Sequence, residues 1–167
     1  VNEDASVTKT GAQDDVLDDD TDADASASLS VSKIKHSTDS SYSSVTSSST
    51  HLSNFTTVTG TYGTLKIGAV GSYIYTADQS LADDLDAGDV VTDVFVYEVS
   101  DGNTGSDTAN ITITVTGIND PVVATDDTDA VNEDASVTKT GAQDDVLNDD
   151  TDADDSATLS VSKIKHS

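Results

Sequence analysis

Short runs in which apolar and polar residues alternate are the main pattern along this chain. In residues 108–117 the apolar residues occupy every second position: Ala109, Ile111, Ile113 and Val115. Residues 94–100 place Phe95, Tyr97 and Val99 on one face. A period of two is typical of a β-strand that is buried on one face. Residues 101–105 between these runs are rich in turn-forming residues, so the pattern predicts a hairpin.

Further strands are expected upstream. Residues 62–68 and 71–77 predict a second hairpin, and residues 29–34 predict another strand. The inward side chains of the second hairpin are expected to be Leu65, Ile67, Tyr73 and Tyr75. Residues 77–87 predict one helical turn, because Leu81 and Leu85 are four residues apart. Short strands with close turn signals and little helix predict an all-β, antiparallel, immunoglobulin-like sandwich.

The Ser- and Thr-rich segment from residue 37 to 59 is open to two interpretations. It is either a long surface loop or a pair of polar strands that covers one sheet edge.

An internal repeat defines the organisation of the chain. Residues 1–37 recur almost unchanged as residues 131–167, with three differences: Asp18/Asn148, Ala25/Asp155 and Ser28/Thr158. A period of this length suits a complete domain in a tandem array. We expect a complete sandwich repeat over residues 1–117, an acidic linker over 118–130 and the opening strands of the next repeat over 131–167. Those opening strands cannot bury their apolar face alone, so we expect them to be disordered, paired with a neighbour or cut from a longer chain.

The charge balance excludes several functions. The chain has 32 acidic and 7 basic residues, for a formal net charge of -25. Such a surface repels nucleic acids and anionic membranes, so we expect neither as a partner. No run of 18 apolar residues is present, so membrane insertion is not expected. The absence of cysteine excludes a disulfide framework and thiolate zinc sites.

The acidic residues gather in a loop that occurs in both copies. Within residues 14–24, aspartates recur at every second position, and the second copy has the same spacing: Asp18, Asp20, Asp22 and Asp24, then Asn148, Asp150, Asp152 and Asp154. Neighbouring carboxylates repel one another, and many oxygen donors favour Ca²⁺. An EF-hand is excluded, because Ala23 and Leu29 stand where that loop needs Gly and Glu. The alternative is a solvated loop that keeps the protein soluble.

More acidic residues flank the boundary between the copies. Asn119 and Asp120 precede Pro121, which restricts Asp120 to extended conformations, and Glu133 lies just inside the second copy. A cation shared by Asp120 and Glu133 would make a stiff joint; the alternative is a flexible, solvated linker.

No catalytic constellation is present, so we expect no enzyme activity. His36, His51 and His166 are isolated in the sequence, and Trp is absent. Paired carboxylates alone do not make a glycosidase, which needs them placed across a sugar cleft.

Two stretches resemble a known family: GTYGTLKIGAVGSYIYTADQ and DVFVYEVSDGNTGSDTANITITVTGINDPV. They are similar to the VCBS-type, cadherin-like repeats of large bacterial surface adhesins. The resemblance implies secretion to the cell surface, a role in adhesion or biofilm, and Ca²⁺ at the joints between sandwiches. The ligands it implies are Asp101, Asn119, Asp120, Glu133, Asp150, Asp152 and Asp154. Glu3, which opens the first copy as Glu133 opens the second, is a further candidate ligand. Ala23-Asp24 and Ala153-Asp154 depart from the pattern, which has Pro-Asp-Gly there.

The expected function is therefore a calcium-stiffened extender of an extracellular adhesin. One alternative is a subunit of a filament assembled by strand complementation between chains. The other is an adhesive tip that binds a cell-surface or matrix ligand. The expected partners are neighbouring repeats of the same chain or identical chains.

Overall fold

The computed structural model describes four stretches of the chain: residues 1–11, 14–24, 27–140 and 145–166. The chain divides into two compact units, Val1–Ile118 and Asn119–Ser167. The first unit holds the two sheets and the helix.

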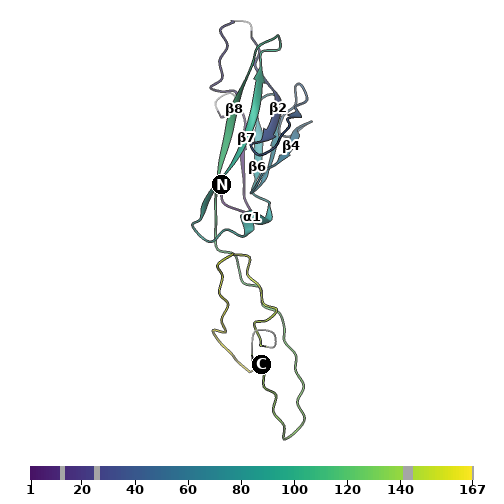
Figure 1. The fold of residues 1–167 in the computed structure, drawn as a ribbon, viewed down its shortest axis with the longest axis vertical. Coiled ribbons are helices and arrows are strands. Elements are labelled where there is room, and N and C mark those ends of the chain that lie inside the picture. Colours follow the sequence, from purple (N-terminus) through teal and green to yellow (C-terminus); the bar gives the residue numbers. More distant parts are fainter. Residues whose placement is uncertain (12–13, 25–26, 141–144, 167) are drawn as a thin grey trace. The chain divides into compact units, whose positions relative to one another are not determined.

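The first unit contains two four-stranded sheets in which all neighbouring strands are antiparallel (Figure 1). In order, one sheet holds β1 (Ser6–Lys9), β6 (Tyr73–Thr76), β5 (Thr64–Ile67) and β4 (Thr56–Thr59). The other holds β3 (Ser43–Ser44), β2 (Ser30–His36), β7 (Val90–Ser100) and β8 (Ser106–Thr116). The predicted all-β antiparallel sandwich is confirmed.

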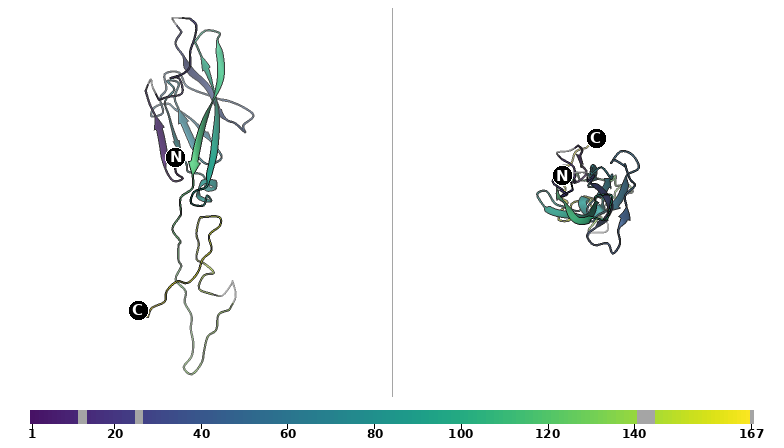
Figure 2. Two further views of the ribbon diagram at one scale, coloured as in Figure 1. Left: turned by 90° about the vertical axis from the view of Figure 1, so that its left-hand side faces the viewer. Right: turned by 90° about the horizontal axis from the view of Figure 1, so that it is seen from above.

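The core lies between the two sheets, which face one another in Figure 2. Alternate residues of β7 and β8 are buried, as the sequence pattern predicted. The inward residues of the second predicted hairpin, now β5 and β6, are buried as well. The rings of Tyr75 and Phe95 meet edge to face across the two sheets, 6.1 Å between centroids. Apolar burial of this kind is the main force that holds a sandwich together.

Three segments match the sequence-based expectations only in part. The segment from residue 37 to 59 supplies one edge strand to each sheet, β3 and β4, so neither the loop nor the single strand pair describes it fully. Strand β1 was not predicted. The helical turn exists as α1 (Ser80–Asp83). However, Leu81 is half exposed, and the buried partners are Ala82 and Leu85.

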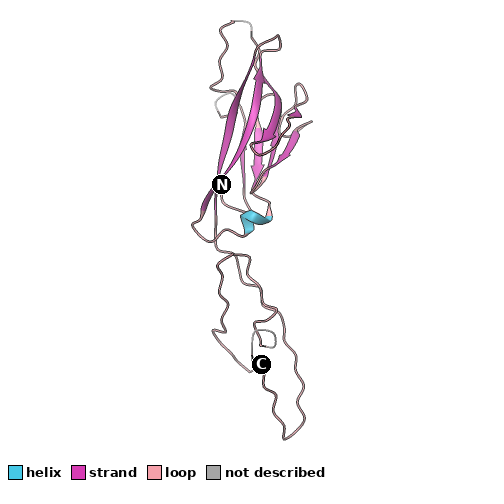
Figure 3. Ribbon diagram, in the orientation of Figure 1, coloured by secondary structure: helices cyan, strands magenta, loops and turns pink. Residues whose placement is uncertain are grey.

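The described residues of the second unit form neither helix nor strand (Figure 3). One isolated antiparallel bridge joins Val123 to Thr151, with N···O distances of 2.7 and 2.9 Å in the two directions. Among the described residues of the whole chain, no helix is long and apolar enough to cross a membrane.

Candidate calcium sites in the acidic loops

The acidic loop of the first unit is fastened to the sandwich by Tyr97. The Tyr97 hydroxyl lies 2.8 Å from the carbonyl oxygen of Val16 and 3.0 Å from Oδ2 of Asp20. The Val16 amide donates to the carbonyl of Gly71 at 3.2 Å. An inward-facing residue of β7 therefore fixes where this loop leaves the sandwich.

The loop faces the turn that joins β7 to β8. In this turn, Oδ1 of Asp101 accepts hydrogen bonds from the amides of Asn103 and Gly105, at 2.7 and 3.1 Å. A side chain at Gly105 would meet the Asp101 carboxylate, because a Cβ there would lie 2.8 Å from Oδ2. In the loop, Oδ1 of Asp22 accepts from the Asp24 amide at 2.7 Å.

A pocket of about 380 Å³ lies where the loop and the turn meet. Its acidic lining residues are Asp19, Asp20, Asp22, Asp101 and Asp107, and no lysine is among its lining residues. Carboxylate, hydroxyl and carbonyl oxygens without thiol or imidazole are the donors that Ca²⁺ prefers. Within the described residues, no three acidic or histidine side chains are close enough together to hold an ion.

The pocket includes some predicted ligands and omits others. Asp20, Asp22 and Asp101 line it, whereas Asp18 and Asp24 do not. Ligands at every second position lie on one side of the chain only if the loop is extended. Instead the loop turns, because the Asp18 amide donates to the carbonyl of Asp15 and the Asp20 amide to that of Leu17. These turns bring in Asp19, which the sequence argument missed. It also missed Asp107, which directly follows the first residue of β8.

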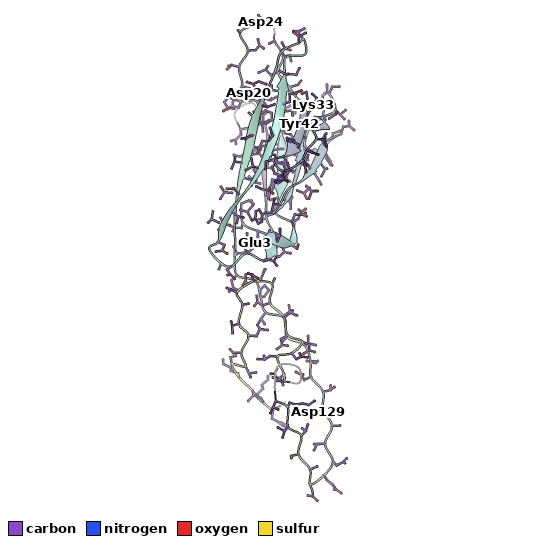
Figure 4. The ribbon with its side chains drawn as sticks, in the orientation of Figure 1. Glu3, Asp20, Asp24, Lys33, Tyr42 and Asp129 are labelled. Carbon is purple, nitrogen blue, oxygen red and sulfur yellow. The ribbon has the colours of Figure 1, made fainter. Side chains whose placement is uncertain are left out.

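Glu3 lies at the other end of the sandwich, beside the end of β8 (Figure 4). Its side chain is buried, and its carboxylate accepts a hydrogen bond from the amide of Ile118. The Glu3 amide donates to the carbonyl of Thr116 at 3.1 Å. Glu3 therefore ties the start of the sandwich to the residue at which the first unit ends.

In the second unit, the acidic loop runs beside the linker. The Asp120 amide donates to Oδ2 of Asp154 at 3.2 Å, and the Thr125 amide donates to Oδ1 of Asp150 at 2.8 Å. Asp152 accepts from the Asp154 amide at 3.1 Å, as Asp22 does from Asp24 in the first copy. The linker thus meets the acidic run that the sequence predicted as a ligand set.

One carboxylate oxygen in this second loop lacks a hydrogen-bond partner. Oδ1 of Asp154 is buried and has no such partner among the described residues. A buried anionic oxygen without a donor is costly, and a cation would satisfy it. This partnerless oxygen and the oxygen-only donors of the loop are the features that a Ca²⁺ ion would satisfy.

The remaining predicted ligands of the second unit lie on its surface. Asn119 and Glu133 are exposed, and so is Asn148. The side-chain amide of Asn119 donates to the carbonyl of Asp120. The structure therefore brings Asp120 together with Asp154, whereas sequence reasoning paired it with Glu133.

A second cluster of polar side chains lies inside the sandwich, and the sequence argument missed it. Asp93 is 0% exposed. Its Oδ1 lies 2.8 Å from Nε2 of His36, and its Oδ2 accepts from the Tyr75 hydroxyl at 2.9 Å. The amides of Thr61 and Tyr62 donate to the same carboxylate at 3.0 and 3.1 Å. Asp93 therefore connects β7 with β2, β6 and the turn before β5.

Burial also raises the pKa of the two tyrosines at these sites. Burial raises the pKa of Tyr75 well above its usual value, and its bond to Asp93 adds to that effect. Burial likewise raises the pKa of Tyr97, and its bond to Asp20 adds to it. Phenols are protonated at neutral pH in any case, and the raised pKa values keep both hydroxyls as donors to the carboxylates at higher pH as well.

No protein-family model matches the chain, and no curated protein matches it in sequence.

Proposed function

We propose that this chain is a calcium-stiffened extender repeat of an extracellular protein, similar to the cadherin-like repeats of bacterial surface adhesins. The proposal rests on one observation about both copies: the acidic segment lies against a second element that also carries carboxylates. In the first unit that element is the β7–β8 turn with Asp101 and Asp107. In the second unit it is the linker with Asp120.

The physical reason is electrostatic. Carboxylates held beside one another in a chain with a net charge of -25 repel, and no lysine lines the pocket of the first unit. A divalent cation removes that repulsion and links the two elements. In the second unit the linked element is the linker itself, so binding would restrict its motion. The near-identical repeat supports a part whose role is reach and stiffness.

Binding is tested by calorimetric titration of the whole chain with Ca²⁺. The informative variant is Asp22→Asn/Asp101→Asn, which removes two charges from the pocket. The matched control is Asp84→Asn/Asp89→Asn, which removes two charges from exposed positions near α1. We expect the pocket variant to lose at least one binding event that the control retains. Equal titrations for both variants would contradict a site in this pocket.

Stiffening is tested separately by ¹⁵N relaxation of residues 119–130. The steady-state nuclear Overhauser effect reports motion on the picosecond to nanosecond timescale. We expect values for the linker to rise toward those of the sandwich when Ca²⁺ is added. An Asp154→Asn variant should keep the linker mobile in Ca²⁺. Linker values that do not change with Ca²⁺ would contradict the stiffening role even if the ion binds.

A further inference from the structure

The same sequence occupies two different environments in this chain. Residues 1–37, the first segment, and residues 131–167, the second segment, differ at three positions. In the first segment, Val31 is 1% exposed and Ile34 is 0% exposed. Their counterparts in the second segment, Val161 and Ile164, are 57% and 95% exposed. In the described structure, the second segment therefore exposes side chains that the first segment buries.

The first segment completes the sandwich by pairing with residues 38–117, the body. Its β1 pairs with β6 along four residues, and its β2 lies between β3 and β7. The body thus has one strand edge and one gap between strands that these 37 residues fill. The edge and the gap offer backbone hydrogen bonds that any strand can accept, and the inward side chains decide which strand fits.

The second segment has the side chains that the strand edge and the gap in the body require. Of the three differing positions, Asp18 and Ser28 are exposed in the first unit, so Asn148 and Thr158 would stand on the surface. The third, Ala25, lies outside the described residues. The buried residues of β2 are identical in both segments, including the histidine that reaches Asp93. Replacing one segment by the other therefore changes no described core contact.

The linker is long enough for this replacement within one chain. In the first unit, Val1 lies beside the end of β8: its amino group lies 2.8 Å from the carbonyl of Thr114, and its carbonyl accepts from the Thr116 amide at 2.9 Å. For Val131 to take the place of Val1, residues 119–130 must loop from Ile118 back to a point beside Thr114. These positions are about 13 Å apart along a strand. The loop can span about 40 Å.

We propose that the body binds either segment of its own chain, so that the sandwich exists in two alternative frames. In one frame residues 1–117 form the sandwich, and in the other residues 38–167 form it while the first segment is released. The body is flanked on both sides by a copy of the part that completes it, and the contacts are the same in both frames. A tethered segment competes at an effective concentration in the millimolar range, well above that of a second chain in dilute solution. This proposal does not rest on calcium binding.

The two isoleucines Ile34 and Ile164 allow a test in the intact chain. Ile34→Asp places a charge in the core of the first frame only, and Ile164→Asp is its matched control in the second. In calcium-containing buffer, we expect each single variant to keep a cooperative unfolding transition with β-sheet circular dichroism. The double variant should lose it. An Ile34→Asp variant as unfolded as the double variant would overturn the proposal, as would folding of Ile34→Asp only in oligomers.

A cross-link tests the position of the second segment directly and does not depend on how well the aspartate variants fold. In β1, Thr8 lies opposite Ile74 of β6, and Thr138 is the counterpart of Thr8. The chain has no cysteine, so a Thr138→Cys/Ile74→Cys variant holds only that pair. Thr8→Cys/Ile74→Cys is the control that reports the first frame. We expect both pairs to form a disulfide within one chain under mild oxidation, read from intact mass. A Thr138→Cys/Ile74→Cys variant that stays reduced, or cross-links only between chains, would overturn the proposal.

Discussion

Replacing Asp93 by asparagine should be among the most destabilising single changes in this sandwich. The carboxylate is 0% exposed and accepts from Tyr75 and from the amides of Thr61 and Tyr62, while His36 lies 2.8 Å away. The side-chain amide of the Asp93→Asn variant would keep one oxygen acceptor and present an NH₂ group to donors that now face the other oxygen.

The contacts of Asp93 set the loss of stability expected for the Asp93→Asn variant. Whichever way the amide turns, about two donors lose their acceptor, and each buried unsatisfied group costs about 1–3 kcal/mol. Removing one partner of a buried charged network costs about 3–5 kcal/mol in general. We therefore expect Asp93→Asn to lower the free energy of unfolding by about 3–5 kcal/mol. The free energy of unfolding of a whole domain is about 5–15 kcal/mol.

The assay is urea unfolding at constant calcium, followed by circular dichroism. Asp89→Asn is the matched control, because Asp89 is exposed just before β7 and its change should stay within about 0.5 kcal/mol. Asp93 belongs to the part of the sandwich that occurs once, so the second segment cannot compensate for its loss. A destabilisation below about 1 kcal/mol for Asp93→Asn would refute this account of the buried cluster.

Three further outcomes follow from the same structure. The folded state raises the pKa of Tyr75 and of Tyr97, so their contribution to the free energy of unfolding is fully present below pH about 10 and is lost as the pH rises above that value. The urea midpoint should therefore be lower at pH 11 than at pH 9. Tyr97→Phe should loosen the acidic loop, costing about 1 kcal/mol in the urea assay and weakening calcium binding in calorimetry, because the bonds to Val16 and Asp20 are lost. Gly60→Ala should cost about 1–3 kcal/mol in the urea assay, because its Cβ would lie 2.2 Å from Oδ2 of Asp93.

The strands β7 and β8 could be predicted from the sequence. In β7 and β8 the side chains point in turn to the core and to solvent, so their faces follow from the pattern alone. The polar edge strands β3 and β4 carry no such pattern, because their pairing depends on neighbours that are distant in sequence. Asp93 did leave a signal: it stands two residues before Phe95, on the inward face of β7. An acidic residue at an inward position indicates a buried network.

The acidic loops could be located from the sequence, but not their geometry. A spacing of two residues predicts ligands on one side only if the loop is extended. Here backbone turns rotate Asp18 away from the pocket and leave Asp19 in its lining. The partners of each loop, the β7–β8 turn and the linker, are set by the tertiary fold. The resemblance named Asp101 and Asp120, which carry carboxylates on those two elements.

Thermal unfolding of the whole chain, in calcium and in excess chelator, tests the central claim most directly. Calcium bound only by the folded state at a hundredfold excess over its dissociation constant stabilises that state by about 2.7 kcal/mol. For a domain of this size the midpoint should rise by roughly 10 °C. Magnesium at the same concentration should give a smaller rise, because it uses fewer carboxylates and keeps more water. Midpoints that coincide in calcium and in chelator would contradict the calcium-stiffened repeat and leave the acidic loops as solvated surface.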